Sequence, residues 1–243
     1  MKHIARKYIF SRTITTLLLC IAAQPLFAEP VGKIQSSYNV LGFGMTLANI
    51  SETFIRTGDS YQIESVTKAV GLLARLKPET IRVSSHGKIT AQGLVPLAYS
   101  LTREVDTHKN TSAKFNWEKS IITHTDHKGV NDFPLAKGTQ DRLSVLYHLP
   151  LLVKTDQTEF KFGIADDNNL EDYNFSLNAE EQNVRLPMGN FKARYISNTP
   201  VGEQVKYEIW MATEGNYFPY KVIVTDAKGG KLTQVLTDIS ITP

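Results

Sequence analysis

Cysteine is almost absent from the 243-residue sequence, in which Cys20 is the only one. Cys20 lies in an N-terminal segment that we expect to be removed, so the remaining chain has neither a disulfide nor a thiol nucleophile. The sequence also lacks a glycine-flanked serine elbow, an HExxH zinc motif and a phosphate-binding glycine loop. It therefore carries no enzyme motif, and a fold without disulfides depends on its hydrophobic core.

Acidic residues are missing from the first 28 positions. The basic residues of this segment are Lys2, Arg6, Lys7 and Arg12. A short apolar run at 13–23 follows them, and Ala28 offers a small residue for cleavage. This order is typical of a secretory signal peptide. We expect a signal peptide over 1–28, a single β-rich domain over 29–243 and a location in the periplasm.

The N-terminal segment allows two alternatives to cleavage. An uncleaved membrane anchor needs about 20 apolar residues, and the run at 13–23 is shorter. Lipidation of Cys20 would require a small residue before it, where Leu19 stands. Cleavage after Ala28 is the better interpretation of both patterns.

An excess of charge of one sign is also lacking once the signal segment is set aside. The whole chain has 27 basic and 24 acidic side chains, and the segment contains four of the basic ones. The remainder has 23 against 24, a net charge near −1. Net charge therefore gives no support to a nucleic-acid partner or to an anionic membrane.

What is present is a repeated alternation of apolar and polar side chains, the pattern of half-buried strands. Strands are expected near the C-terminus at 204–211, 217–225 and 231–241. In the first, Tyr207 and Trp210 lie on opposite faces, which predicts a partly exposed Trp210. In the third, Val235 is expected on the same face as Ile239.

Similar patterns occur upstream. The run at 94–105 is expected to place Val95, Leu97, Tyr99 and Leu101 on one face. Further strands are expected at 159–164, 173–177, 183–186 and 191–197.

The strongest helix pattern covers 139–149, where apolar residues recur at helical spacing and Thr139 can cap the start. A short helix is expected at 70–76, before Pro78. The fold class that follows is all-β: a curved antiparallel sheet or partly open β-barrel of about ten to twelve strands with one or two short helices.

Several short motifs resemble one family of bacterial exported proteins. They are GLL at 71–73, Gly87, GLVPLAY at 93–99, GTQDRLS at 138–144, MGNF at 188–191, EIW at 208–210 and YFP at 217–219. In this order they are similar to the family grouped as domain of unknown function 3108, over nearly all of the chain after residue 28. The resemblance implies an exported Gram-negative envelope protein of mostly β structure. It implies no activity and no catalytic residues.

Two clusters contain metal-ligating residue types. His124, Asp126, His127 and Asp132 lie close in sequence, but a zinc site needs three or four converging ligands, and we interpret them as a solvated turn. The acidic run at 166–172 lacks the spacing and central glycine of a calcium loop. No metal and no cofactor is therefore predicted.

The candidate ligand-binding residues are Asp141 and Arg142 at the start of the predicted helix, together with four aromatic residues: Tyr99, Trp117, Trp210 and Tyr217. Arg142 is expected to pair with a carboxylate such as Glu208. Exposed aromatic side chains are what sugar stacking or a lipid-facing cleft would use.

Three functions from different classes remain open. The first is a non-enzymatic periplasmic protein that binds an apolar or amphipathic envelope molecule, a lipid or a glycan, in the cavity of the curved sheet. The second is an envelope assembly or interaction protein that uses free strand edges. The third is a glycan-processing enzyme, which needs two carboxylates about 5–10 Å apart in one cleft, with Asp141 and Glu208 as the candidate pair.

Overall fold

The computed structural model describes residues 32–153, 157–166 and 169–242. The expected signal segment, Cys20 and the centre of the acidic run at 166–172 lie outside these residues. The described residues form one sheet of fifteen strands, two α-helices and two short 3-10 helices. The all-β class is confirmed, and the strand number exceeds the expected one.

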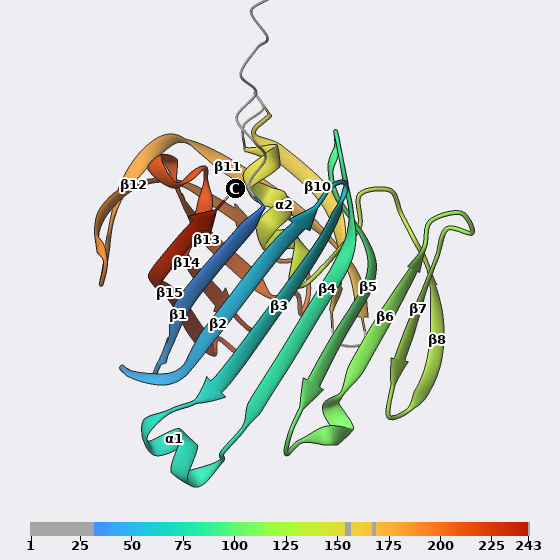
Figure 1. The fold of residues 1–243 in the computed structure, drawn as a ribbon, viewed down its shortest axis with the longest axis horizontal. Coiled ribbons are helices and arrows are strands. Elements are labelled where there is room, and N and C mark those ends of the chain that lie inside the picture. Colours follow the sequence, from blue (N-terminus) through green and yellow to red (C-terminus); the bar gives the residue numbers. More distant parts are fainter. Residues whose placement is uncertain (1–31, 154–156, 167–168, 243) are drawn as a thin grey trace, which may run out of the picture. The chain divides into compact units, whose positions relative to one another are not determined.

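Strands β1 (Lys33–Gly42) and β15 (Lys231–Thr242) pair side by side in the middle of the sheet (Figure 1). From β1 the sheet continues through β2 to β8 in sequence order, and from β15 it continues backwards through β14 to β9. All neighbouring pairs are antiparallel except β10 and β9. Because nearly every connection is a hairpin, each half of the sheet is a meander.

The other strands are β2 (Met45–Thr57), β3 (Ser60–Ala69), β4 (Thr80–Thr90), β5 (Gly93–Arg103), β6 (Thr111–Asn116), β7 (Ile121–Asp126), β8 (Gly129–Pro134), β9 (Gln140–Asp141), β10 (Glu159–Asp166), β11 (Asn169–Leu186), β12 (Gly189–Asn198), β13 (Lys206–Ala212) and β14 (Phe218–Thr225). The 3-10 helices are η1 (Thr107–Lys109) and η2 (Thr213–Gly215).

Two bulges change the faces that alternation predicts. In β15, Ser37 pairs with Asp238 but Tyr38 pairs with Leu236, so the extra residue between them shifts the pattern. Leu236, and not Val235, therefore lies opposite buried Tyr38.

The second bulge lies in β5, where Pro96 pairs with Gly87 and Ala98 pairs with His86. Leu97 is the extra residue, and its side chain is exposed. The prediction that Val95 and Leu97 share a face with Tyr99 is therefore wrong. Tyr99 is buried on the inner face, as is Pro96.

The strands expected at 173–177 and 183–186 are parts of one strand, β11. Its first half pairs with β10 and its second half mainly with β12. The register shifts between Leu177 and Glu181, which interrupts the alternation and makes one strand resemble two.

Two helices interrupt the strands. α1 (Gly71–Leu76) is confirmed, and none of its residues is buried. α2 (Ser144–Leu152) begins five residues after the expected start, because residues 140–141 form β9 and Thr139 Oγ1 donates to Ala136 O (2.8 Å) instead of capping a helix. Neither is long and apolar enough to cross a membrane, among the residues that the structure describes.

α2 lies on the concave side of the curved sheet, between the two halves (Figure 1). Leu143 and Tyr147 pack in a hydrophobic cluster formed mainly with β1–β7. Val145 and Leu149 pack in a second cluster formed with β10–β14. A helix used on both sides is buried almost throughout, so the amphipathic character expected for it is not found.

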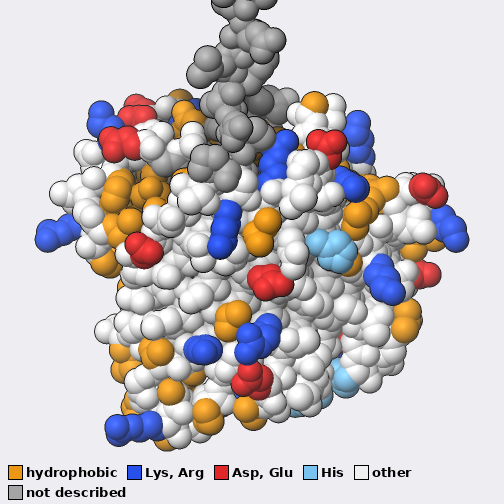
Figure 2. Space-filling model, in the orientation of Figure 1, with side chains coloured by type: hydrophobic (Ala, Val, Ile, Leu, Met, Phe, Trp, Pro, Cys, Tyr) orange, Lys and Arg blue, Asp and Glu red, His pale blue; other side chains and the backbone are white. Residues whose placement is uncertain are grey.

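Hydrophobic side chains also remain on the surface. Figure 2 shows several of them beside Lys and Arg side chains at the lower left of the view, over the region of α1 and the β1–β2 turn.

Candidate functional site

Asp141 fixes the start of α2. Its Oδ1 accepts hydrogen bonds from the backbone N of Leu143 (2.9 Å) and of Ser144 (2.7 Å). Its Oδ2 accepts one from Ser85 Oγ on β4 (2.6 Å), and the Tyr61 hydroxyl lies 3.2 Å from that same Ser85 oxygen. Asp141 therefore caps the helix and attaches it to the opposite half of the sheet.

Gln140 makes a second attachment. Its Nε2 donates to Leu94 O at the start of β5 (2.9 Å), and its Oε1 accepts from Ser144 Oγ (2.9 Å). Strand β9, at one edge of the sheet, is thereby held against β5 from the other half.

Asp141 is completely buried. Burial raises its pKa to about 6, and the hydrogen bonds from Ser85, Ser144 and Leu143 oppose that rise only in part. The carboxyl thus changes protonation in mildly acidic conditions.

Arg142, the next residue, points outward. Its Nη1 lies 3.4 Å from Asp166 Oδ1, so the expected pairing with Glu208 is wrong. Glu208 lies on the outer face of β13, where it accepts a hydrogen bond from the Tyr195 hydroxyl (3.1 Å) and lies 3.5 Å from Lys206 Nζ.

Glu52 is a second buried carboxyl. The Tyr147 hydroxyl of α2 donates to Glu52 Oε1 (2.7 Å). Burial raises the pKa of Glu52, and hydrogen bonds from Tyr147 and Ser65 lower it in part. The Tyr147 ring is stacked on Phe54, with 5.0 Å between centroids.

His148 is the third buried ionisable group on or beside α2. Its Nδ1 accepts a hydrogen bond from Leu94 N (3.1 Å). Burial lowers the pKa of His148 to about 4, which keeps the ring neutral near pH 7, as the accepting nitrogen requires. A Cβ at Gly93 would lie 2.5 Å from the His148 ring, so only glycine fits there.

Glu52, Asp141 and His148 are each exposed by 5% or less. They can gain or lose protons when the pH changes, but they present no reactive atom to solvent. Their hydrogen bonds join α2 and the residues before it to β2, β4 and β5.

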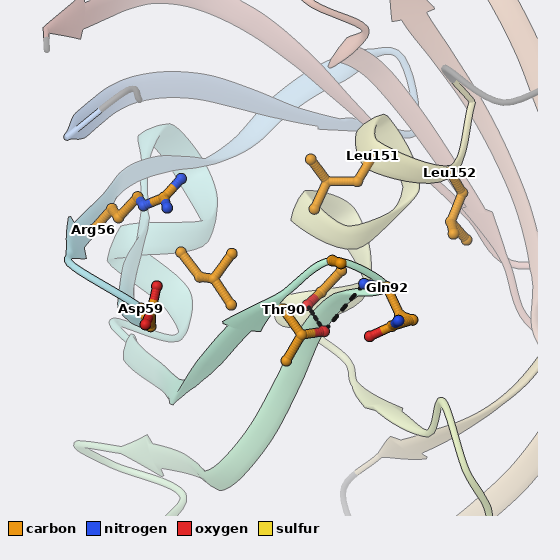
Figure 3. A pocket seen from close by; sticks show the side chains of 9 residues that line it. Arg56, Asp59, Thr90, Gln92, Leu151 and Leu152 are labelled. Atoms are coloured by element: carbon orange, nitrogen blue, oxygen red, sulfur yellow. Dashed lines mark hydrogen bonds between the residues drawn. The ribbon is translucent and has the colours of Figure 1, made fainter. Parts of the chain in front are cut away.

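An open cleft of about 700 Å³ lies beside the end of α2. It is lined by the β2–β3 turn, the β4–β5 hairpin and α2, through Arg56, Asp59, Ile89, Thr90, Ala91, Gln92, Gly93, Leu151 and Leu152. Figure 3 shows the Arg56 guanidinium and the Leu151 side chain pointing toward each other from β2 and α2. The hairpin is fixed by Thr90 Oγ1, which donates to Gly93 O (3.1 Å) and accepts from Gln92 N (3.2 Å).

The six residues proposed from sequence do not meet in this cleft. Tyr99 is a core residue on β5, and Trp117 is half-buried, with its Nε1 donating to Pro96 O (2.6 Å). Trp210 lies on the outer face of β13, as expected, with Lys221 Nζ 4.4 Å from its ring centroid. Tyr217 lies half-buried before β14, and Asp141 and Arg142 point in different directions.

The carboxylate pair considered for glycan chemistry is not formed. Asp141 is buried against Ser85 and α2, whereas Glu208 lies on the opposite face of the sheet with Tyr195.

His124 is not in a solvated turn, as had been expected. It is buried on β7, with its ring edge-on to Phe133 at 5.8 Å. The part of the chain that the structure describes contains no group of three His, Cys, Asp or Glu side chains arranged for a metal ion.

The family described as "Protein of unknown function (DUF3108)" matches residues 33–237. The chain belongs to this family. Comparison with curated proteins gives no significant match.

Comparison with solved structures identifies a protein with a similar fold. A β-barrel-like protein of domain of unknown function DUF1849 from Brucella abortus is 11% identical, with a TM-score of 0.55 over 87% of this chain and 98% of that one. The similarity shows a shared fold and nothing further.

Two other structures are more distant. A candidate lipoprotein from Parabacteroides distasonis is 9% identical with a TM-score of 0.35, over 88% of this chain and 97% of that one. A candidate exported protein with a YmcC-like fold from Bacteroides fragilis is 10% identical with a TM-score of 0.28, over 87% and 96%. At these scores neither supports an argument.

Sequence reasoning singled out Asp141 at the start of α2 but missed the cleft and the other polar residues around the helix. The sequence did contain one signal. Glu52 lies two residues from both Ile50 and Phe54, so the alternating pattern places its carboxyl on the same buried face. Ser85 and His148 carried no comparable local signal, because their partners are far away in sequence.

Proposed function

We propose that this is a non-enzymatic exported protein, cleaved after Ala28 and located in the periplasm, which binds an anionic amphipathic envelope molecule in the cleft beside α2. The observation that carries the proposal is the exposure of the Leu151 side chain. It is 41% exposed at the end of an otherwise buried helix, and it faces the Arg56 guanidinium.

The lining suits a molecule with two chemistries. Arg56 offers a cation for a phosphate or carboxylate. Ile89, Leu151 and Leu152 offer apolar surface for an acyl chain. We propose the rim of the sheet, and not a central cavity, as the binding place, because α2 and the two hydrophobic clusters cover the concave face.

Native mass spectrometry tests the proposal. The protein is purified from the periplasm, examined under gentle conditions and extracted with solvent, and lysophosphatidylglycerol is then added as a defined probe. We expect a lipid-like adduct and probe binding that weakens about tenfold in Arg56→Gln and in Leu151→Asn, since each removes one recognised part of the probe.

Matched controls are Arg82→Gln and Val130→Asn, which change exposed residues outside the cleft. Equal binding by all four variants would place the ligand elsewhere. The ligand role proposed for Tyr99, Trp117, Asp141, Arg142, Trp210 and Tyr217 would then be tested next, by Trp210→Ala and Tyr217→Ala.

A bare mass and no probe binding would contradict the proposal. It would favour an interaction protein that uses a sheet edge such as β8.

A further inference from the structure

Five exposed apolar side chains gather at the end of the sheet opposite the cleft, and we call them the apolar patch. They are Phe43 (89% exposed), Met45 (49%), Leu72 (60%), Leu76 (75%) and Leu232 (45%). The segments that carry them are neighbours: Val70 N, just before α1, donates to Leu47 O on β2 (2.9 Å), and Thr233 on β15 pairs with Leu41 on β1.

Phe43 is held outward by an unfavourable backbone. Phe43 (φ 50) and Gly44 (φ 75) form the β1–β2 turn, and two positive φ values in succession favour Asn-Gly or Gly-Gly. A bulky residue at the first position is an outlier that also loses the gain of burial. Neither feature stabilises the fold, so Phe43 is better explained by contact with something outside the chain.

Basic side chains surround the patch. Leu72 and Leu76 lie one helical turn apart on α1, beside exposed Arg75 and Lys77. Lys68 and Lys231 are exposed at the ends of β3 and β15 that border the patch.

Two acidic groups near α1 are already engaged. Glu79 accepts hydrogen bonds from the backbone N of Val105 (3.1 Å) and Asp106 (3.3 Å). Asp106 lies 2.8 Å from Lys109 Nζ and 3.8 Å from Lys77 Nζ. Around α1 the patch is thus apolar, with Arg75 and Lys68 as exposed cations beside it.

We propose that the apolar patch docks on an anionic lipid bilayer. Phe43, Leu72 and Leu76 insert at the level of the headgroups, while Arg75, Lys68 and Lys231 contact the lipid phosphates. A protein partner would not require this ring of cations. The docking surface lies at the opposite ends of the strands from the cleft, so either proposal can fail without the other.

Vesicle co-flotation tests the docking. The protein, as purified from cells that express the whole sequence, is mixed with vesicles of phosphatidylethanolamine and phosphatidylglycerol (3:1) or of phosphatidylcholine alone. We expect binding to the anionic vesicles that decreases with added salt. Phe43→Asn should weaken vesicle binding about tenfold. The double variant Leu72→Gln with Leu76→Gln should weaken vesicle binding more than that.

The matched control is Val130→Gln with Val201→Gln, two exposed valines outside the patch, which should bind like the wild type. Phe43→Asn suits the turn, so a lower melting temperature cannot account for its loss of binding. Equal vesicle binding by the patch variants and the wild type, or no binding at all, would overturn the proposal.

Discussion

The Tyr147 hydroxyl of α2 donates a hydrogen bond of 2.7 Å to Glu52 on β2, a residue 95 positions earlier in the chain. Both partners are buried, and Asp141 makes the corresponding attachment of α2 to Ser85 on β4. The helix is thus held by two carboxyls that come from different parts of the sequence.

Replacing Tyr147 by Phe should lower the free energy of unfolding by about 2 kcal/mol, because a buried carboxyl loses a hydrogen-bond donor. Urea titration at pH 7 measures the change. The control is Tyr195→Phe, which removes a hydroxyl bonded to the partly exposed Glu208 and should cost less than about 1 kcal/mol. Equal losses of unfolding free energy in the two variants would show that the buried Tyr147–Glu52 hydrogen bond stabilises the protein no more than the one to Glu208.

Asp141 should make the protein less stable as the pH rises from about 4 to 6. Its pKa in the folded protein is about 6, above the ordinary value of 3.8. The folded state therefore binds more protons than the unfolded state in this window. Asp141→Asn stays neutral and should gain about 2–3 kcal/mol relative to the wild type between pH 4 and 7.

Urea titrations at several pH values between 4 and 8 measure this difference. Asp238→Asn, at an exposed site on β15, serves as the control and should follow the wild type. A constant gap between Asp141→Asn and the wild type would refute the raised pKa.

His148 should have the opposite effect on the pH dependence of stability. Its pKa is lowered from 6.5 to about 4, so the unfolded state binds more protons between these values and stability decreases as the pH falls through them. His148→Asn should remove about 3 kcal/mol of this decrease, whereas His86→Asn, on an exposed part of β4, should not. The same titrations report both, and an unchanged slope in His148→Asn would contradict the assignment.

Gly93→Ala should destabilise the protein by about 2–4 kcal/mol. The new Cβ would strike the His148 ring, and Gly93 has a φ of +113. Gly129→Ala has a similar backbone (φ +135) with nothing within 4 Å of the added carbon, and should cost only about 1 kcal/mol. Thermal unfolding compares the two, and equal costs would mean that strain alone acts at Gly93.

Local patterns predicted the strands well where the pairing is regular. Tyr207 and Trp210 lie on opposite faces of β13, as the alternation indicated. The bulges at Thr237 and Leu97 were not predictable, because a single extra residue leaves no mark in the composition of the strand. For this reason the faces predicted for Val235 and Leu97 were wrong.

The partners of the polar groups that attach α2 were beyond local reasoning. Thr139 fits a helix cap by its residue type, but Asp141 takes that role because Ser85, 56 positions earlier, holds its other oxygen. A partner at that distance is set by the fold. The sequence therefore marked Asp141 only as a residue at the helix start, and Glu52 only as a carboxyl on an apolar face.

The pairing of β1 with β15 has a consequence for the order in which the sheet forms during synthesis. Because chains tend to fold from the N-terminal end during synthesis, we expect residues 33–134 to form their meander before β15 is made. The two halves share their central ladder only through the final twelve-residue strand, Lys231–Thr242. A nascent or truncated chain that stops before this strand therefore exposes the inner edge of each half, and the sheet is completed last at its centre.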